Sequence, residues 1–303
     1  MAVTSPHVWL DGEIVDLSRA AAPLMGHAIQ RGSLVFDVGS FHGTARGRAL
    51  FRAPEHVARF MRSARIVGLA IPFARGTLVH AAEAVMRALP ADRAEGLLRW
   101  SAFFGATESD LLPRDDATRV AVAAQLLEDP PRTTPFRVAT FVDCRKAAPE
   151  ALSPEAKVAA AYLGPLLAKR RAIASGAEEI VLLDASGGIA EAPTANVFAV
   201  KDGALWTPPL RYVLPGITRD AVLAIARAEG ISIREAPLPP DSLETADEAF
   251  LTATSFPITP IGSVNGHALA AAPGPVTTRL VERFDAIQHG RDETFASWLR
   301  FVD

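Results

Sequence analysis

Cysteine is almost absent from this sequence: Cys144 is the single one among 303 residues. An internal disulfide and a zinc site built from several cysteines are therefore excluded, and the composition fits a reducing cytoplasm. The net charge is −3, so no broad basic surface indicates nucleic-acid binding. No apolar run reaches the ~18 residues of a membrane span. The first residues also lack the basic start and apolar core of a secretory signal. We therefore expect a cytoplasmic protein with no nucleic-acid or membrane partner.

Lysine is scarce as well, with four copies in the chain. Lys169 stands beside two arginines and is typical of a solvated helix face, and Lys201 precedes an Asp-Gly turn. Lys146 shows no sign of burial. Lys157 lies in AKVAAAYL, among small apolar residues that solvate an ammonium poorly and so favour the neutral amine. A neutral amine is what an imine-forming nucleophile needs. A lysine whose stem covers a helix end is an equally good interpretation of the spacing alone.

Strands and helices alternate without a strict βαβ order, which favours an α+β or mixed α/β fold in two domains. Residues 127–135 contain three prolines and suit an interdomain linker between residues 1–126 and residues 136–303. The patterns predict strands at residues 7–10, 13–15, 33–41, 49–51, 95–105, 120–125, 136–142, 180–183, 231–234 and 248–254. They predict one helix that starts at Pro54 and three further helices at residues 77–89, 219–229 and 275–288.

A predicted hairpin ends at a carboxylate that is followed by residues with small side chains, which leave space beside the backbone. The strand over residues 180–183 is followed by a turn at residues 186–188 and a returning strand that reaches Glu191. The small residues APTAN come next. A carboxylate in this setting can hold the protonated ring nitrogen of a pyridine cofactor. An exposed glutamate at a strand end is the alternative.

The segment LPGITRD, residues 214–220, leads into a predicted helix. Gly216 lets the backbone approach a ligand closely. Ile217 and Thr218 would present backbone N–H groups at the helix start, with the Thr218 hydroxyl beside them, which favours a bound phosphate. A threonine that caps the helix is the alternative.

In this order and spacing, the segments resemble the class IV, or fold type IV, pyridoxal-phosphate (PLP) enzymes, most closely their branched-chain aminotransferase branch. The resemblance covers nearly the whole chain and implies a two-domain fold similar to D-amino-acid aminotransferases, with the PLP lysine in the larger, C-terminal domain. It rests on AKVAAAY around the family's Schiff-base lysine, on residues 183–209, on LPGITRD, on residues 246–254, on the helix FRAPEHVARFMRSA and on the ending GPVTTRL.

The resemblance implies roles for individual residues. Lys157 forms the Schiff base with PLP, and its freed amine moves a proton between the substrate carbon and the cofactor. Glu191 keeps the ring nitrogen protonated, with Asn196 beside it, and Tyr162 bonds the cofactor hydroxyl. The implied phosphate contacts are Arg59, Ile217, Thr218, Thr254 and Ser255.

Departures from the family pattern gather around the substrate. Arg31 and Leu97 stand where the pattern has tyrosines, and Val38 stands where it has glycine. The Gln-Arg-Gly segment that contains Arg31 is closer to the D-amino-acid and (R)-amine branches. Residues 160–161 replace a Gly-Asn pair. We assign six residues to the substrate pocket: Arg31, Phe36, Val38, Leu97, Arg99 and Phe256.

We therefore expect a homodimeric transaminase that moves an amino group between an amino acid or chiral amine and a 2-keto acid. A lyase similar to aminodeoxychorismate lyase, which would release pyruvate, is one alternative. A PLP-binding protein with little turnover is the other. The seven histidines form no HxxxH or HxH pair, so we expect no metal site.

Overall fold

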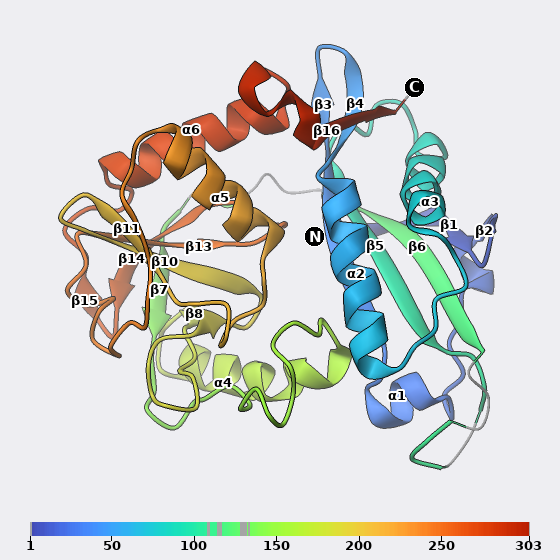
Figure 1. Ribbon diagram of the computed structural model, residues 1–303, viewed down its shortest axis with the longest axis horizontal. Helices are drawn as coiled ribbons and strands as arrows, with labels where there is room; N and C mark the ends of the chain where they lie inside the picture. The colour runs from blue at the N-terminus through green and yellow to red at the C-terminus, as the bar shows by residue number, and fades with distance from the viewer. Residues whose placement is uncertain (1, 108–109, 114–116, 128–131, 133, 303) are drawn as a thin grey trace. The chain divides into compact units, whose positions relative to one another are not determined.

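The computed structural model describes residues 2–107, 110–113, 117–127, 132 and 134–302, and Figure 1 shows the course of the chain. It contains two compact units. Unit 1 comprises Met1–Pro130, Ala156–Ala160 and Ile287–Asp303, and unit 2 comprises Pro131–Glu155 and Ala161–Ala286. The predicted domains meet at a single boundary in the chain. In the structure, the segment that carries Lys157 belongs to unit 1, together with the N-terminal residues. Most of the predicted linker, residues 127–135, lies outside the described residues.

Unit 1 is built on a seven-stranded sheet in the order β16-β4-β3-β5-β6-β1-β2. Its strands are β1 (Ala2–Leu10), β2 (Glu13–Asp16), β3 (Val35–Thr44), β4 (Gly47–Phe51), β5 (Gly96–Phe104), β6 (Thr118–Leu127) and β16 (Leu299–Val302). The predicted N-terminal hairpin is confirmed. Leu10 pairs with Glu13, and Asp11 and Gly12 turn the chain with φ values of 48° and 114°.

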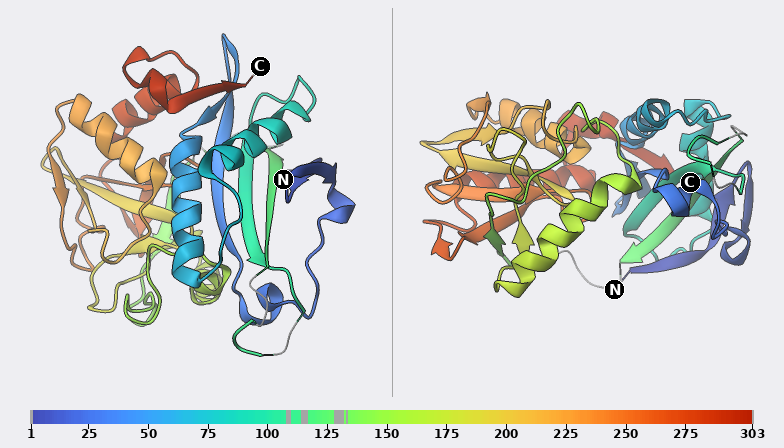
Figure 2. Two further views of the ribbon diagram at one scale, coloured as in Figure 1. Left: turned by 45° about the vertical axis from the view of Figure 1, so that its right-hand side comes forward. Right: turned by 90° about the horizontal axis from the view of Figure 1, so that it is seen from below.

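Helices α2 (Ala53–Val67) and α3 (Arg75–Arg87) lie against one face of this sheet (Figure 2). The helix predicted to start at Pro54 is confirmed as α2, on which Val57, Phe60 and Ala64 are buried. Trp100 of β5 donates a hydrogen bond from Nε1 to the Leu78 carbonyl of α3 at 2.9 Å. The unit also holds α1 (His27–Arg31) and the 3-10 turns η1 (Leu17–Arg19) and η3 (Glu293–Trp298).

Unit 2 is built on a nine-stranded sheet whose main path runs β12-β11-β10-β13-β14-β7-β8, with β9 on β10 and β15 on β14. Its strands are β7 (Phe136–Ala139), β8 (Glu179–Ile180), β9 (Glu191–Ala192), β10 (Ala195–Lys201), β11 (Ala204–Thr207), β12 (Ile233–Glu235), β13 (Glu248–Thr252), β14 (Thr259–Val264) and β15 (His267–Ala268). β7 and β8 are shorter than the sequence predicts.

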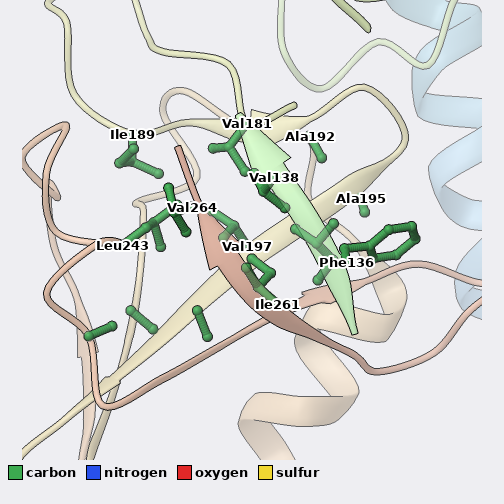
Figure 3. Close-up of a cluster of buried hydrophobic side chains, with 14 of the residues drawn as sticks. Phe136, Val138, Val181, Ile189, Ala192, Ala195, Val197, Leu243, Ile261 and Val264 are labelled. Atoms are coloured by element: carbon green, nitrogen blue, oxygen red, sulfur yellow. The ribbon is translucent and has the colours of Figure 1, made fainter. Parts of the chain in front are cut away.

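The core of unit 2 is an apolar cluster around the middle strands, in which Val138, Val197 and Ile261 lie close together (Figure 3). Val197 and Ile261 are fully buried. Burying each such side chain contributes about 1.5–3 kcal/mol. The strands next to this cluster, β9, β10 and β13, carry three of the site residues described below, so the core fixes their backbone positions.

Helices α4 (Leu163–Ala174), α5 (Ile217–Ala228) and α6 (Pro275–Gln288) complete the fold, with η2 (Ala159–Tyr162) before α4. α4 packs through Ala168 and Ala172. α5 begins two residues before the predicted start, which places Ile217 and Thr218 in its first turn. Among the helices that the structure describes, none has both the length and the apolar character needed to cross a membrane.

Candidate active-site residues and family

In unit 1, the segment that carries Lys157 runs beside β3 and is fixed by its main chain. The Phe36 N–H donates to the Lys157 carbonyl at 3.0 Å, and the Ala159 N–H donates to the Leu34 carbonyl at 2.8 Å. The Lys157 N–H donates to Ser63 Oγ of α2 at 3.0 Å. The side chain then projects over an aromatic ring, with Nζ 5.0 Å from the centroid of Phe36.

The other three lysines hold their ammonium groups against carboxylates. Lys146 pairs with Glu191, Lys169 with Glu179 at 2.6 Å, and Lys201 with Asp247 at 3.5 Å. These ion pairs engage the ammonium groups of all three lysines. Lys146, whose sequence context shows no sign of burial, is half-buried in the structure, with 18% of its side chain exposed.

Arg59, on α2, is held by a carboxylate that sequence reasoning missed. Its Nε and Nη2 donate to the two oxygens of Asp37 at 2.7 and 2.8 Å, and His56 Nδ1 lies 2.7 Å from Asp37 Oδ1. Asp37 is fully buried in β3. The available signal was a charged residue inside the apolar run SLVFDVGSF, because a buried charge requires a partner. This bidentate contact fixes the plane of the Arg59 guanidinium.

The environment of this cluster shifts the pKa values of Asp37 and His56. Burial raises the pKa of Asp37, but the Arg59 guanidinium and the hydrogen bonds from His56 and Arg59 outweigh it and hold that pKa well below its usual range. Burial is the largest influence on His56 and lowers its pKa, against the opposing effect of Asp37. His56 is therefore a neutral donor to Asp37 at neutral pH.

Four of the predicted substrate-pocket residues share one face of the sheet in unit 1. Val38 pairs with Arg99 across β3 and β5, and Leu97 pairs with Ser40. Because side chains alternate between faces, Phe36, Val38, Leu97 and Arg99 lie on the face opposite Asp37. The Arg99 guanidinium lies 4.8 Å from the Phe36 ring centroid. Arg31 ends α1 and is exposed.

In unit 2, Glu191 and Asn196 face each other across the hairpin formed by β9 and β10. Both are buried, with 9% and 5% of the residue exposed. Asn196 Nδ2 donates to Glu191 Oε2 at 2.9 Å and to the Leu214 carbonyl at 3.0 Å. The Leu214 N–H donates to the same Oε2 at 3.0 Å. Asn196 therefore links the carboxylate to the segment that leads into α5.

Gly216 precedes α5 and has no space for a side chain. A Cβ at this position would meet Asn196 Oδ1 well inside 3.0 Å and the Cβ of Arg219 at 3.2 Å. Arg219 holds the helix start through hydrogen bonds of 2.9 Å from its Nη2 to the Pro208 carbonyl and Glu235. The backbone N–H groups at a helix start point toward the end of the helix, where an anion can accept from them. Thr218 is buried there.

The remaining predicted residues of unit 2 lie near the end of β13 and the start of α4. Thr254 is half-buried and Ser255 is exposed. Phe256 packs edge-on against Phe136, with 5.8 Å between the ring centroids. Tyr162 is half-buried at the residue before α4.

Sequence reasoning overlooked Thr252, the partner of Asn196 across β10 and β13. Its hydroxyl is buried, and no described residue forms a hydrogen bond with it. Such groups normally find a partner in the protein, in ordered water or in a ligand.

A group of possible metal ligands lies elsewhere in unit 1. His42 Nδ1 is 2.7 Å and His289 Nε2 is 3.3 Å from the Glu95 carboxylate, and their donor atoms lie within 4.8 Å of one another. His42 Nε2 also lies 2.9 Å from Ser40 Oγ. These contacts satisfy the three side chains as a hydrogen-bonded cluster, and we assign no metal to it.

The chain belongs to the class IV aminotransferase family, whose model matches residues 34–264. This confirms the family resemblance and, with it, a PLP-dependent aminotransferase of mixed α+β fold. Among curated proteins it is similar to the branched-chain-amino-acid aminotransferases of Pseudomonas aeruginosa, at 31% identity over 97% of both chains, and of Escherichia coli K12, at 32% over 98% of this chain and 97% of that one.

Solved structures agree with this assignment. A branched-chain aminotransferase from Thermoproteus uzoniensis with norvaline has a TM-score of 0.92 at 30% identity and covers 100% of both chains. The T.th. branched-chain amino acid aminotransferase complexed with N-(5'-phosphopyridoxyl)-L-glutamate has a TM-score of 0.93 at 32% identity and covers 98% of both chains.

Proposed function

We propose that this protein transfers the amino group of an apolar amino acid to a 2-keto acid with PLP as its cofactor. One arrangement in unit 2 carries the proposal. Asn196 bonds the buried Glu191 carboxylate and also fills the space against Gly216 at the start of α5. A carboxylate suits a pyridinium nitrogen and a helix start suits a phosphate. The Thr252 hydroxyl beside Asn196, which no described residue bonds, also fits a polar ligand.

The protein's own groups have distinct tasks in this scheme. The bound cofactor supplies an electron sink for the substrate's α-carbon. Glu191 accepts the hydrogen bond of the ring nitrogen and keeps the proton on it. Arg59, Ile217, Thr218, Thr254 and Ser255 bind the phosphate, and Tyr162 donates to the cofactor hydroxyl. Lys157 would hold the cofactor through its side-chain amine, which is also the group placed to take and return the proton of the substrate's α-carbon.

The substrate class follows from the shared sheet face of unit 1. Phe36, Val38 and Leu97 offer apolar surface, and Arg99 offers a guanidinium that suits a carboxylate. An amino acid with an apolar side chain has the matching groups. The relatives named above act on branched-chain amino acids, which supports the same class of donor here. We further propose that the enzyme works as a homodimer in the cytoplasm.

A donor panel tests this function. Purified PLP-loaded protein is mixed with single L- and D-amino acids, including branched-chain ones, and with (R)- and (S)-amines, and the cofactor's absorbance is followed. We expect branched-chain amino acids to convert the cofactor to its amine form, and a 2-keto acid to reverse the change. Conversion by the amines or D-amino acids alone would contradict the proposed donor class.

The same experiment separates the two alternatives. Pyruvate release from aminodeoxychorismate without a keto-acid acceptor would indicate a lyase. A cofactor spectrum that no donor changes would indicate a protein that binds PLP with little turnover. The aminotransferase relatives favour neither alternative.

A further inference from the structure

Lys146 contacts the carboxylate of Glu191 although the two residues lie on different segments of unit 2. Main-chain hydrogen bonds place these segments together. The Lys146 N–H donates to the Leu183 carbonyl at 2.8 Å, and the Leu182 N–H donates to the Glu191 carbonyl at 3.0 Å. Only 18% of the Lys146 side chain and 12% of the Glu191 side chain are exposed. The pair is therefore a built feature of the hairpin and is largely shielded from water.

The Glu191 carboxylate can accept more hydrogen bonds than the described residues donate to it. Each carboxylate oxygen accepts about two hydrogen bonds. Oε2 already accepts from Asn196 Nδ2 and from the Leu214 N–H. Oε1 accepts from Lys146 Nζ. Among the described residues, Oε1 therefore keeps room for one further donor, directly beside the Lys146 ammonium.

We propose that Lys146 is a positioning residue for the cofactor, and this inference rests on the proposed role of Glu191 as the partner of the ring nitrogen. The Lys146 ammonium orients Glu191 so that the free acceptor position of Oε1 takes the ring N–H. Lys146 thereby strengthens cofactor binding without touching the reacting carbon.

A double-mutant cycle on the cofactor-free protein tests the pair itself. The variants are Lys146→Met, which keeps the length of the stem, Glu191→Gln, and the double variant, each unfolded in urea. We expect the two substitutions to be non-additive, because Lys146→Met alone leaves a buried charge without its partner. If Lys146→Met does not fold, the double variant, which lacks both charges, should fold. Additive effects in this cycle would overturn the proposal.

PLP titration of the same proteins tests the consequence for the cofactor. We expect Lys146→Met to weaken PLP binding about tenfold or more, equivalent to about 1.4 kcal/mol, and Lys146→Arg to restore most of the affinity. Lys201→Met is the matched control and should bind PLP as the wild type does, because Lys201 pairs with Asp247 at the opposite end of β10 from Asn196. Wild-type PLP affinity in Lys146→Met would overturn the proposal.

Glu191→Gln separates this inference from the proposed function. If Glu191→Gln binds PLP as tightly as the wild type and keeps its cofactor spectrum, the assigned role of Glu191 fails, and the coupling of residues 146 and 191 in the cofactor-free protein then reports a structural ion pair only. If Glu191→Gln weakens binding but Lys146→Met does not, the role of Glu191 stands and that of Lys146 fails.

Discussion

Gly216→Ala tests the link between the start of α5 and the Glu191 carboxylate. The φ and ψ of Gly216, −65° and 131°, suit alanine, so the backbone itself adds no strain. The new Cβ would lie well inside 3.0 Å of Asn196 Oδ1, whereas ordinary contacts begin near 3.4 Å. Asn196 must therefore move, and its hydrogen bonds of 2.9 Å to Glu191 and 3.0 Å to the Leu214 carbonyl are lost.

The expected loss of stability has two sources, the steric clash and the lost hydrogen bond to Glu191. Overpacking costs about 1–3 kcal/mol, and a hydrogen bond to a charged acceptor contributes about 1.5–3 kcal/mol. Alanine also lowers the conformational entropy of the unfolded chain relative to glycine, which offsets about 0.4–1 kcal/mol of the lost stability. We expect the free energy of unfolding to fall by roughly 1.5–5.5 kcal/mol. PLP binding should weaken as well, because Glu191 loses one of the groups that orient it.

The assay is urea unfolding of the cofactor-free protein, together with PLP titration. Gly164→Ala is the matched control, because its Cβ would meet nothing within 4 Å in α4; a stability equal to or slightly above that of the wild type is expected. Adding Asn196→Ala to Gly216→Ala should recover part of the loss by removing the clashing side chain. Wild-type stability in Gly216→Ala, or no recovery in the double variant, would refute the reasoning.

Two further predictions concern the buried cluster of unit 1. Asp37→Asn should lower the free energy of unfolding by about 3–5 kcal/mol, because Arg59 loses its buried partner, whereas Asp202→Asn at an exposed turn should unfold in urea as the wild type does. The stability of the wild type should fall as pH drops below about 6.5, because unfolded His56 gains a proton that the folded form, with its lowered pKa, resists. The lowered pKa of Asp37 adds a loss only at pH values below its ordinary 3.8. The free energy of unfolding, measured between pH 8 and 4, tests this pH dependence. If His56→Gln showed the same pH dependence as the wild type, the role assigned to His56 would be contradicted.

The sequence is most informative where function depends on local spacing. The hairpin at Glu191 and the helix start at Ile217 each lie within one short segment, and turn residues and helix signals locate them. The start of α5 differs from the prediction by two residues because Ile217 and Thr218 have poor helix propensity, while the hydrogen bond from the Asp220 N–H to the Gly216 carbonyl already closes the first turn.

Partners far apart in the chain could not be predicted in the same way. Lys146 and Glu191 meet because main-chain hydrogen bonds align their segments through Leu183 and Leu182, and no local pattern encodes that alignment. Asp37 and Arg59 meet because β3 packs against α2. In that case the sequence did hold a signal, a carboxylate inside an apolar strand, but it did not identify the partner.

Borohydride reduction of the PLP-loaded protein, followed by peptide mass analysis, tests the central claim most directly. The account predicts that the reduced cofactor is attached to the peptide that contains Lys157, and that Lys157→Ala lacks the reducible visible absorbance. Attachment at Lys146, Lys169 or Lys201, or an unchanged reducible absorbance in Lys157→Ala, would contradict the assignment of Lys157 as the lysine that bonds the cofactor.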